Sequence, residues 1–259
     1  MEMENMYDVF ADFYDQVHKD YTQDLPLWIE YARKCGSPIL ELACGTGRAL
    51  IPLAKEGFEV TGLDSNGSML KKAKENIKRE PEEVQSRIRL IESDMTEFEI
   101  KKKFNLILIV FNSFQHLLTI EDQDNCLKAI HRHLTDNGRL IITVFHPDLT
   151  RPEGVIRKED YKLIQDSPEK GDKTELFHCQ YFNHKKQETD VSYFLDTQKP
   201  NGQLQRKKMS FTIHYFFPTE FERMLISHGF VVEELFGNFD KSQFTGKSPL
   251  MIFVARKVS

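Results

Sequence analysis

The sequence has few cysteines, no long apolar run and no strong excess of either charge. Its four cysteines form no Cys-x-x-Cys pair and have no histidines at matching spacings, which argues against a zinc site and a disulfide framework. The longest apolar runs, such as Leu106–Phe111, are far shorter than the ~20 residues that span a bilayer. We therefore expect no transmembrane helix and no membrane partner.

The charge balance also argues against a polyanionic partner. The 35 basic and 40 acidic residues give a net charge of −5, so no global field attracts nucleic acid. The basic run Arg206–Lys208 lies in a segment of nearly balanced charge, and we expect it to be a solvated strand face. The acidic N-terminus lacks the pattern of a signal peptide, which favours a cytoplasmic location. No carboxylate cluster indicates a metal, and nothing predicts an oligomeric state.

Strand and helix patterns alternate over the first 146 residues. Short apolar segments, typical of buried strands, are separated by amphipathic segments that predict helices. The predicted strands are 38–44, 58–64, 87–94, 104–111 and 139–145, and the predicted helices are 45–57, 66–80 and 121–138. Repeated β-α-β units with apolar strands predict a parallel sheet that is covered on both faces.

Residues 147–217 have a different character, with period-two stretches that predict antiparallel strands. A helix at 218–230 and two strands at 231–237 and 249–257 follow. We therefore expect one α/β domain formed by residues 1–146 and 218–259, interrupted by an antiparallel insertion at 147–217.

The most informative residues lie where the first strand turns toward the first helix. Glu41 lies near the end of that strand, and Gly45 and Gly47 allow the backbone to pass close to a ligand. Asp64 ends the second strand, where an acidic side chain can accept both hydroxyls of a ribose. Together these residues predict a ligand that contains a nucleoside.

Two ligand classes use this arrangement. A dinucleotide fingerprint needs a small residue three positions after its second glycine, but Leu50 stands there, and the frame that begins at Ala43 places Arg48 there. A nicotinamide-dependent oxidoreductase is therefore the weaker interpretation.

The stretch Glu41-Leu-Ala-Cys-Gly-Thr-Gly-Arg48 resembles motif I of the Rossmann-like S-adenosylmethionine-dependent methyltransferases. The resemblance extends through the segments around Asp64, Asp94 and Phe111, and over roughly three-quarters of the chain. It implies a seven-stranded, mostly parallel sheet with helices on both faces, closed by an antiparallel hairpin. The cofactor-binding residues implied are Glu41, Ala43, Gly45, Gly47, Asp64, Ser65, Asp94, Met95, Phe111 and Asn112. Ala43 departs from the family, because many members have glycine there.

The opening Tyr7–Asp15 is similar to that of small-molecule methyltransferases, including glycine and amino-sugar N-methyltransferases. This resemblance implies that Tyr14 lies over cofactor and substrate, and that residues 147–217 form an antiparallel β lid. His116 follows the fourth strand, where related enzymes have a histidine beside the substrate. A structural role as a core aromatic for Tyr14, or as a helix cap for His116, is about equally favoured.

His146 and Asp148, after the fifth strand, are weaker candidates. The resemblance implies transfer of a methyl group to nitrogen or oxygen of a small polar metabolite. A catalytically idle cofactor-binding protein with the same fold is the alternative from another class.

Overall fold

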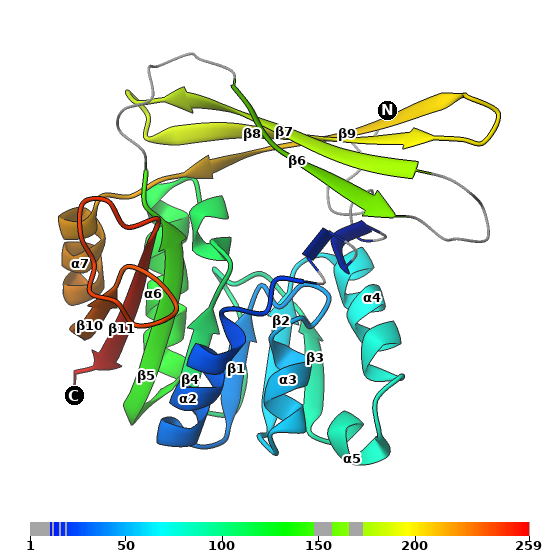
Figure 1. Cartoon of the computed structure of the whole chain (residues 1–259). Coiled ribbons are helices and arrows are strands. Elements are labelled where there is room, and N and C mark those ends of the chain that lie inside the picture. Colours follow the sequence, from blue (N-terminus) through cyan, green and yellow to red (C-terminus); the bar gives the residue numbers. More distant parts are fainter. Residues whose placement is uncertain are drawn as a thin grey trace. The chain divides into compact units, whose positions relative to one another are not determined.

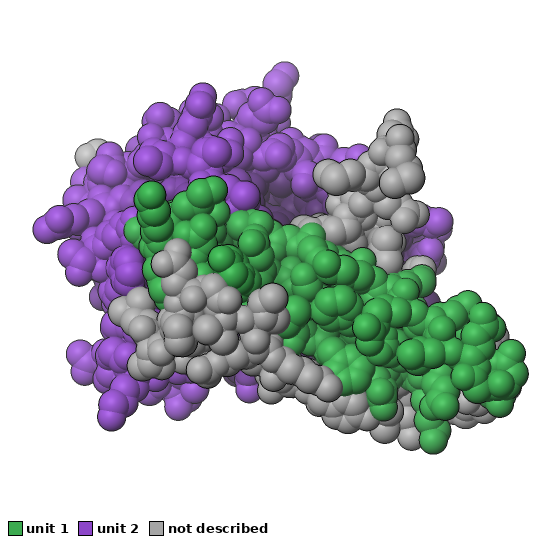
Figure 2. Space-filling view, turned by 90° about the horizontal axis from the view of Figure 1, so that it is seen from above, with its two compact units in different colours: residues 1–20, 148–214 green, residues 21–147, 215–259 purple. Residues whose placement is uncertain are grey.

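The computed structural model describes residues 11–258, except positions 12, 16, 19, 148–156 and 166–172; for 157–165 it describes the backbone alone. The chain divides into two compact units, which Figure 2 distinguishes by colour. Unit 1 combines the residues up to Asp20 with Asp148–His214, and unit 2 combines Tyr21–Pro147 with Tyr215–Ser259. The first twenty residues thus group with the antiparallel segment, whereas the sequence led us to expect them in the α/β domain.

Unit 2 contains the predicted seven-stranded sheet, with the strand order β10-β11-β5-β4-β1-β2-β3 (Figure 1). Neighbours among β1 to β5 pair in parallel, and β11 pairs antiparallel with both β5 and β10. This arrangement confirms the predicted fold class. The strands are β1 Ile39–Leu42, β2 Val60–Asp64, β3 Ile88–Glu92, β4 Phe104–Ile109, β5 Leu134–Phe145, β10 Phe230–Phe236 and β11 Leu250–Lys257.

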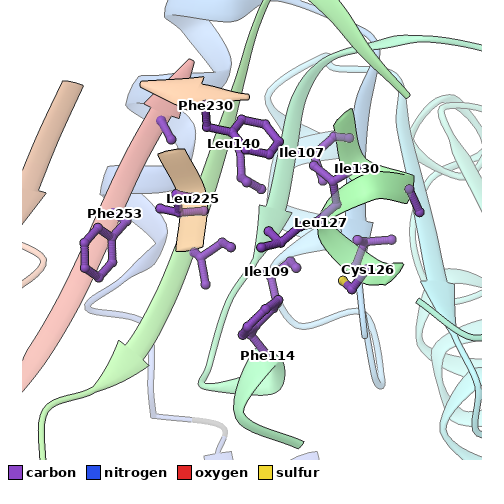
Figure 3. Packing of buried hydrophobic residues seen from close by; sticks show 14 of the residues in the cluster. Ile107, Ile109, Phe114, Cys126, Leu127, Ile130, Leu140, Leu225, Phe230 and Phe253 are labelled. Atoms are coloured by element: carbon purple, nitrogen blue, oxygen red, sulfur yellow. The ribbon is translucent and has the colours of Figure 1, made fainter. Parts of the chain in front are cut away.

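Helices cover both faces of this sheet, because successive side chains of its strands point to opposite faces and both sets are apolar. On one face the strands pack against α6 and α7, where Ile107, Leu127 and Phe253 belong to one buried cluster (Figure 3). On the other face, Leu106 and Leu108 pack with residues of α2 and α3. The helical elements are α2 Leu25–Cys35, α3 Leu50–Lys55, α4 Gly67–Ile77, α5 Glu82–Gln85, η1 Ser113–His116, α6 Ile120–His133 and α7 Pro218–Ser227.

The predicted helix at 121–138 is too long. Helix α6 ends at His133, because Leu134 already has an extended backbone and pairs with Phe104 of β4. Gly138, expected to end the helix, instead lies within β5, near an irregularity in the β4–β5 register. A Cβ atom there would lie 3.0 Å from the carbonyl oxygen of Phe104, so the strands approach too closely for a side chain.

Unit 1 contains a four-stranded antiparallel sheet with the order β6-β7-β8-β9. Its strands are β6 Arg157–Gln165, β7 Lys173–Asn183, β8 Glu188–Gln198 and β9 Leu204–His214. Leu176, Leu195 and Met209 form its apolar cluster together with Val17, and Tyr14 packs against this cluster. This packing explains why the residues before Tyr21 belong to unit 1.

No helix in the described part of the chain is both long and apolar enough to cross a membrane.

Candidate cofactor-binding site

The candidate site lies at the carboxyl ends of β1 and β4 in unit 2. From β1 the chain builds the sheet toward β2 and β3 on one side, and β4 and β5 lie on the other side. The strand order therefore reverses between β1 and β4. Open α/β sheets bind ligands in the crevice outside such a switch point.

The turn after β1 has an unusual backbone. Ala43, Gly45 and Gly47 have φ values of 54°, 55° and 85°, all in the left-handed region. Glycine adopts this region at little cost, whereas Ala43 adopts it against a steric penalty. A Cβ atom on Gly45 would lie 3.2 Å from the Met69 methyl group, so space also favours glycine at that position. Ala43, which stands where many family members have glycine, thus has the left-handed backbone that glycine favours.

Asp64 fixes this turn from the end of β2. Its Oδ2 accepts a hydrogen bond of 2.8 Å from the Gly45 N–H, and its Oδ1 accepts one of 2.8 Å from the Asn66 N–H. Burial raises the pKa of the Asp64 carboxyl, although the two N–H groups oppose this shift. Each carboxylate oxygen has a second lone pair, so Asp64 retains the capacity to accept ribose hydroxyls.

Glu41 is buried on β1, and its exposed fraction is 3%. Loss of hydration raises its pKa to about 8; Arg48 lowers the pKa, whereas Asp24 and Asp64 add to the rise. The carboxyl is therefore mostly protonated at neutral pH. Its Oε2 has no hydrogen-bond partner among the described residues and is therefore available to a ligand, as an acceptor or, where it carries the proton, as a donor.

The loop after β4 contributes the opposite border of the crevice. Phe111 and Asn112 are consecutive non-glycine residues with φ values of 57° and 65°. Such conformations are costly and persist when their surroundings enforce them, often at functional sites. Within the described part of the chain, the buried Oδ1 of Asn112 also accepts no hydrogen bond.

The other predicted cofactor contacts are less distinctive. Asp94 is exposed, and its Oδ1 accepts hydrogen bonds of 2.7 Å from both the N–H and the hydroxyl of Thr96, as a loop-capping residue does. Met95 packs against the buried cluster under α6, and Ser65 is exposed directly after β2. These positions are compatible with ligand contacts, but they already have local structural roles or face solvent.

His116 ends the short helix η1 beyond β4. Its neighbour Gln115 is fully buried and accepts a hydrogen bond of 2.9 Å from the N–H of Phe145, which ties η1 to the end of β5. Burial lowers the pKa of His116 to about 4, so its imidazole is neutral at physiological pH. A neutral imidazole can accept a hydrogen bond, but a group with this pKa is a weak base at neutral pH.

The remaining candidates belong to other elements of the chain. Tyr14 is part of unit 1, where its ring lies 4.6 Å from that of His18. His146 lies at the end of β5, and its Nδ1 lies 2.9 Å from the carbonyl oxygen of Ser248. Asp148 falls outside the described residues. Among the residues that are described, no three His, Cys, Asp or Glu side chains are placed to hold a metal ion.

The structure also shows why Leu50 fits where a dinucleotide fingerprint requires a small residue. Leu50 is fully buried at the start of α3 and faces Gly62 of β2. A Cβ on Gly62 would lie 3.0 Å from the Leu50 side chain and 2.7 Å from the sulfur of Cys44. The glycine that allows close packing of helix and strand is therefore on the strand, and the turn differs from the dinucleotide pattern.

A group of residues beside the turn could not be predicted from the sequence. Arg48 donates hydrogen bonds of 2.8 and 2.7 Å to the two carboxylate oxygens of Asp24, which is 1% exposed. Asp24 also accepts a 3.0 Å hydrogen bond from the indole of Trp28. The position of Arg48 next to Gly47 was the available signal, but nothing in the sequence pairs it with Asp24.

Comparison with known proteins identifies this architecture. Residues 39–138 match a family model described as "Methyltransferase domain". This segment is similar to the methyltransferase domains that the family model describes. The matched segment runs from β1 to β5 and includes the turn, Asp64 and the loop after β4, and the fold is that of Rossmann-like S-adenosylmethionine-dependent methyltransferases.

Similar proteins include YqeM of Bacillus subtilis (strain 168), which carries a provisional methyltransferase name; the two are 28% identical over 97% of each chain. A glycine/sarcosine N-methyltransferase of Aphanothece halophytica is 32% identical over 50% of this chain and 48% of its own, so the chain spans about half of that relative. An amino pentose methyltransferase from Micromonospora echinaspora, solved with S-adenosylmethionine bound, superposes with a TM-score of 0.72 at 19% identity. That superposition covers 100% of this chain and 98% of the other.

The residues at the switch point fit S-adenosylmethionine. The buried oxygens without hydrogen-bond partners among the described residues there, Glu41 Oε2 and Asn112 Oδ1, are acceptors, and the cofactor carries donors in its ammonium, ribose hydroxyls and adenine amino group. Gly45 and Gly47 add no side chains of their own to the turn that could obstruct a ligand. Unsatisfied acceptors of this kind are costly in a buried site without a ligand, and a bound cofactor offers the donors that they lack.

Proposed function

We propose that the protein is an S-adenosylmethionine-dependent methyltransferase that methylates the amino group of a small polar metabolite such as an amino acid or an amino sugar. The observation that carries the cofactor assignment is the pair of buried oxygens of Glu41 and Asn112 that lack hydrogen-bond partners within the described part of the chain and border the switch point beside the glycine turn. The similarity to a glycine/sarcosine N-methyltransferase supports nitrogen as the methyl acceptor.

When bound, S-adenosylmethionine supplies a methyl group that its sulfonium already activates. The chain therefore needs no covalent nucleophile, and its task is to hold the acceptor nitrogen in line with the methyl carbon and to exclude water. Because the sulfonium charge disappears during transfer, a site with little water and aromatic walls favours the transition state. Phe111 is a candidate wall.

In this proposal His116 orients the acceptor. Its neutral imidazole accepts a hydrogen bond from the acceptor amine and so directs the nitrogen lone pair toward the methyl group. The pKa of about 4 argues against storage of a proton on His116 at neutral pH. Its role is therefore orientation, and the released proton leaves with solvent or buffer.

Unit 1 is the proposed substrate lid, and Tyr14 is its proposed contact with the substrate. The apolar cluster of this unit joins the N-terminal segment to the antiparallel sheet, so Tyr14 and the sheet form one body. Lids of this kind gate entry and exclude water from the reaction. Phe182 and Tyr193 are candidate aromatic walls, because they lie on the face of the sheet that carries this apolar cluster; Tyr181 and Phe194, their neighbours in β7 and β8, point to the opposite face.

The test begins with parallel calorimetric titrations of the full chain with S-adenosylhomocysteine and with NAD. We expect binding of the former alone; binding of NAD alone would contradict the proposal. The protein is then incubated with S-adenosylmethionine and with matched acceptors that differ in one group, glycine against glycolate and a 3-amino sugar nucleotide against its 3-hydroxy counterpart. Mass spectrometry should detect one added methyl group on the amines only. Methylation of the hydroxyl compounds alone would replace nitrogen with oxygen as the acceptor.

A further inference from the structure

Arg48 lies in a cluster of aromatic rings that the glycine turn alone does not require. Its guanidinium carbon lies 4.9 Å from the centre of the Phe111 ring and 5.2 Å from that of Tyr21. The two rings contact each other edge to face, with centres 5.0 Å apart. Arg48 also donates a 3.0 Å hydrogen bond to the Tyr21 carbonyl oxygen. A planar guanidinium can satisfy all of these contacts at once, whereas a lysine ammonium cannot.

These contacts connect the two borders of the switch point. Arg48 follows the turn after β1, and Phe111 belongs to the strained loop after β4. A left-handed conformation at two consecutive non-glycine residues needs neighbours that hold it in place. The ring of Phe111 is held by Arg48 and Tyr21, and Arg48 is held in turn by both oxygens of the buried Asp24.

We propose that Arg48 is a positioning residue for cofactor binding, which acts through Phe111: anchored on Asp24, its guanidinium holds the loop after β4 in the conformation that presents Phe111 and Asn112 to the cofactor. This inference rests on the proposed function, since it assigns a role within the same site. A purely structural ion pair would stabilise the fold but would leave the affinity of the folded protein for cofactor unchanged.

The test is a double-mutant cycle on the dissociation constant for S-adenosylhomocysteine, measured by calorimetry with the full chain. The variants are Arg48→Lys, Phe111→Leu and the double variant. Arg48→Lys keeps the positive charge but loses the paired hydrogen bonds to Asp24 and the planar group that stacks on the rings. Arg33→Lys is the matched control, because Arg33 is exposed and pairs with Glu56 on the surface. We expect Arg48→Lys and Phe111→Leu each to weaken binding by about tenfold, and the control to leave it unchanged.

If Arg48 acts through Phe111, the dissociation constant of the double variant should lie within about twofold of that of the single variant that binds S-adenosylhomocysteine less tightly. Multiplicative losses, or an unchanged dissociation constant for Arg48→Lys at a temperature where it is folded, would overturn the inference. If Arg48→Lys does not fold, Phe111→Leu provides the test, because it leaves the Arg48–Asp24 pair intact. Unchanged binding of S-adenosylhomocysteine by Phe111→Leu would then overturn the inference. Failure of the unaltered protein to bind S-adenosylhomocysteine would instead refute the proposed function.

The single tryptophan supplies a further readout. Trp28 is fully buried and shares the carboxylate of Asp24 with Arg48. We expect S-adenosylhomocysteine to change the Trp28 emission in the unaltered protein and to change it less in both single variants, at ligand concentrations that saturate each. An equal change in all three proteins would show that Trp28 responds to the ligand independently of Arg48 and Phe111, and would overturn the inference.

Discussion

Replacement of Asp64 by alanine should destabilise unit 2 as well as weaken cofactor binding. The substitution removes the acceptor for two N–H groups, those of Gly45 and Asn66, each of which donates over 2.8 Å. A hydrogen bond to a charged group contributes about 1.5–3 kcal/mol, so the two bonds amount to about 3–6 kcal/mol. The burial that raises the pKa of Asp64 offsets part of this sum, and we expect a net loss near the lower end, about 3 kcal/mol.

The assay is urea denaturation followed by the fluorescence of Trp28, which lies in unit 2 and so reports on that unit. Asp64→Asn keeps an acceptor oxygen for one of the two backbone N–H groups but places its amide N–H against the other. Its stability should therefore lie between that of the unaltered protein and that of Asp64→Ala. Asp136→Ala is the control, because the Asp136 side chain is 79% exposed and its ion pair with Lys257 is weak. A change below about 0.5 kcal/mol for Asp64→Ala would refute the reasoning that Asp64 holds the turn.

Three further substitutions test individual assignments. Folded Glu41 keeps its proton up to a pKa of about 8, whereas the unfolded chain releases it near 4.5, so the contribution of Glu41 to stability falls as pH rises between these values, by about 1.4 kcal/mol per unit. The difference in unfolding free energy between the unaltered protein and Glu41→Gln should therefore change by this amount per pH unit in urea titrations from pH 5 to 8. His116→Ala should slow methyl transfer and leave the affinity for S-adenosylhomocysteine unchanged. If the rate of the unaltered protein changes with pH near 6.5 and that of His116→Ala does not, His116 does not have a pKa of about 4. Ala43→Gly should stabilise the protein by about 0.5 kcal/mol because it relieves a left-handed alanine, whereas the control Ala73→Gly in α4 should destabilise it in the same denaturation assay.

The sequence was sufficient to predict the sheet of unit 2, because its signals are local. Each strand is a short apolar run, and each helix between strands has a one-sided apolar face, so alternation alone implies a parallel sheet. The glycine turn was also predictable, since Gly45 and Gly47 have the left-handed backbone that their residue type favours. The end of α6 was not, because the residues from Thr135 to Gly138 suit a helix end as well as the irregular start of a strand.

Contacts between distant segments could not be predicted. Asp24 and Arg48 are separated by a helix and a strand, and nothing about either residue names the other as its partner. The same is true of the bond from Gly45 to Asp64: the sequence indicated an acid near a ribose, and the fold adds that this acid also holds the turn. Titration shifts depend on burial as well, so a sequence that suggests an ordinary histidine gives no sign that the pKa of His116 falls to about 4.

The distribution of backbone strain connects these observations. Left-handed residues occur at Ala43, Gly45 and Gly47 after β1 and at Phe111 and Asn112 after β4, on both sides of the switch point. Two of the five are glycines and signal their conformation in the sequence; the other three are residues for which this conformation is costly and persists only where the surroundings hold it. For Phe111 those contacts are the Arg48 guanidinium and the Tyr21 ring. A site of this design therefore depends on residues that need not touch the ligand, and their loss should lower cofactor affinity even where the protein remains folded.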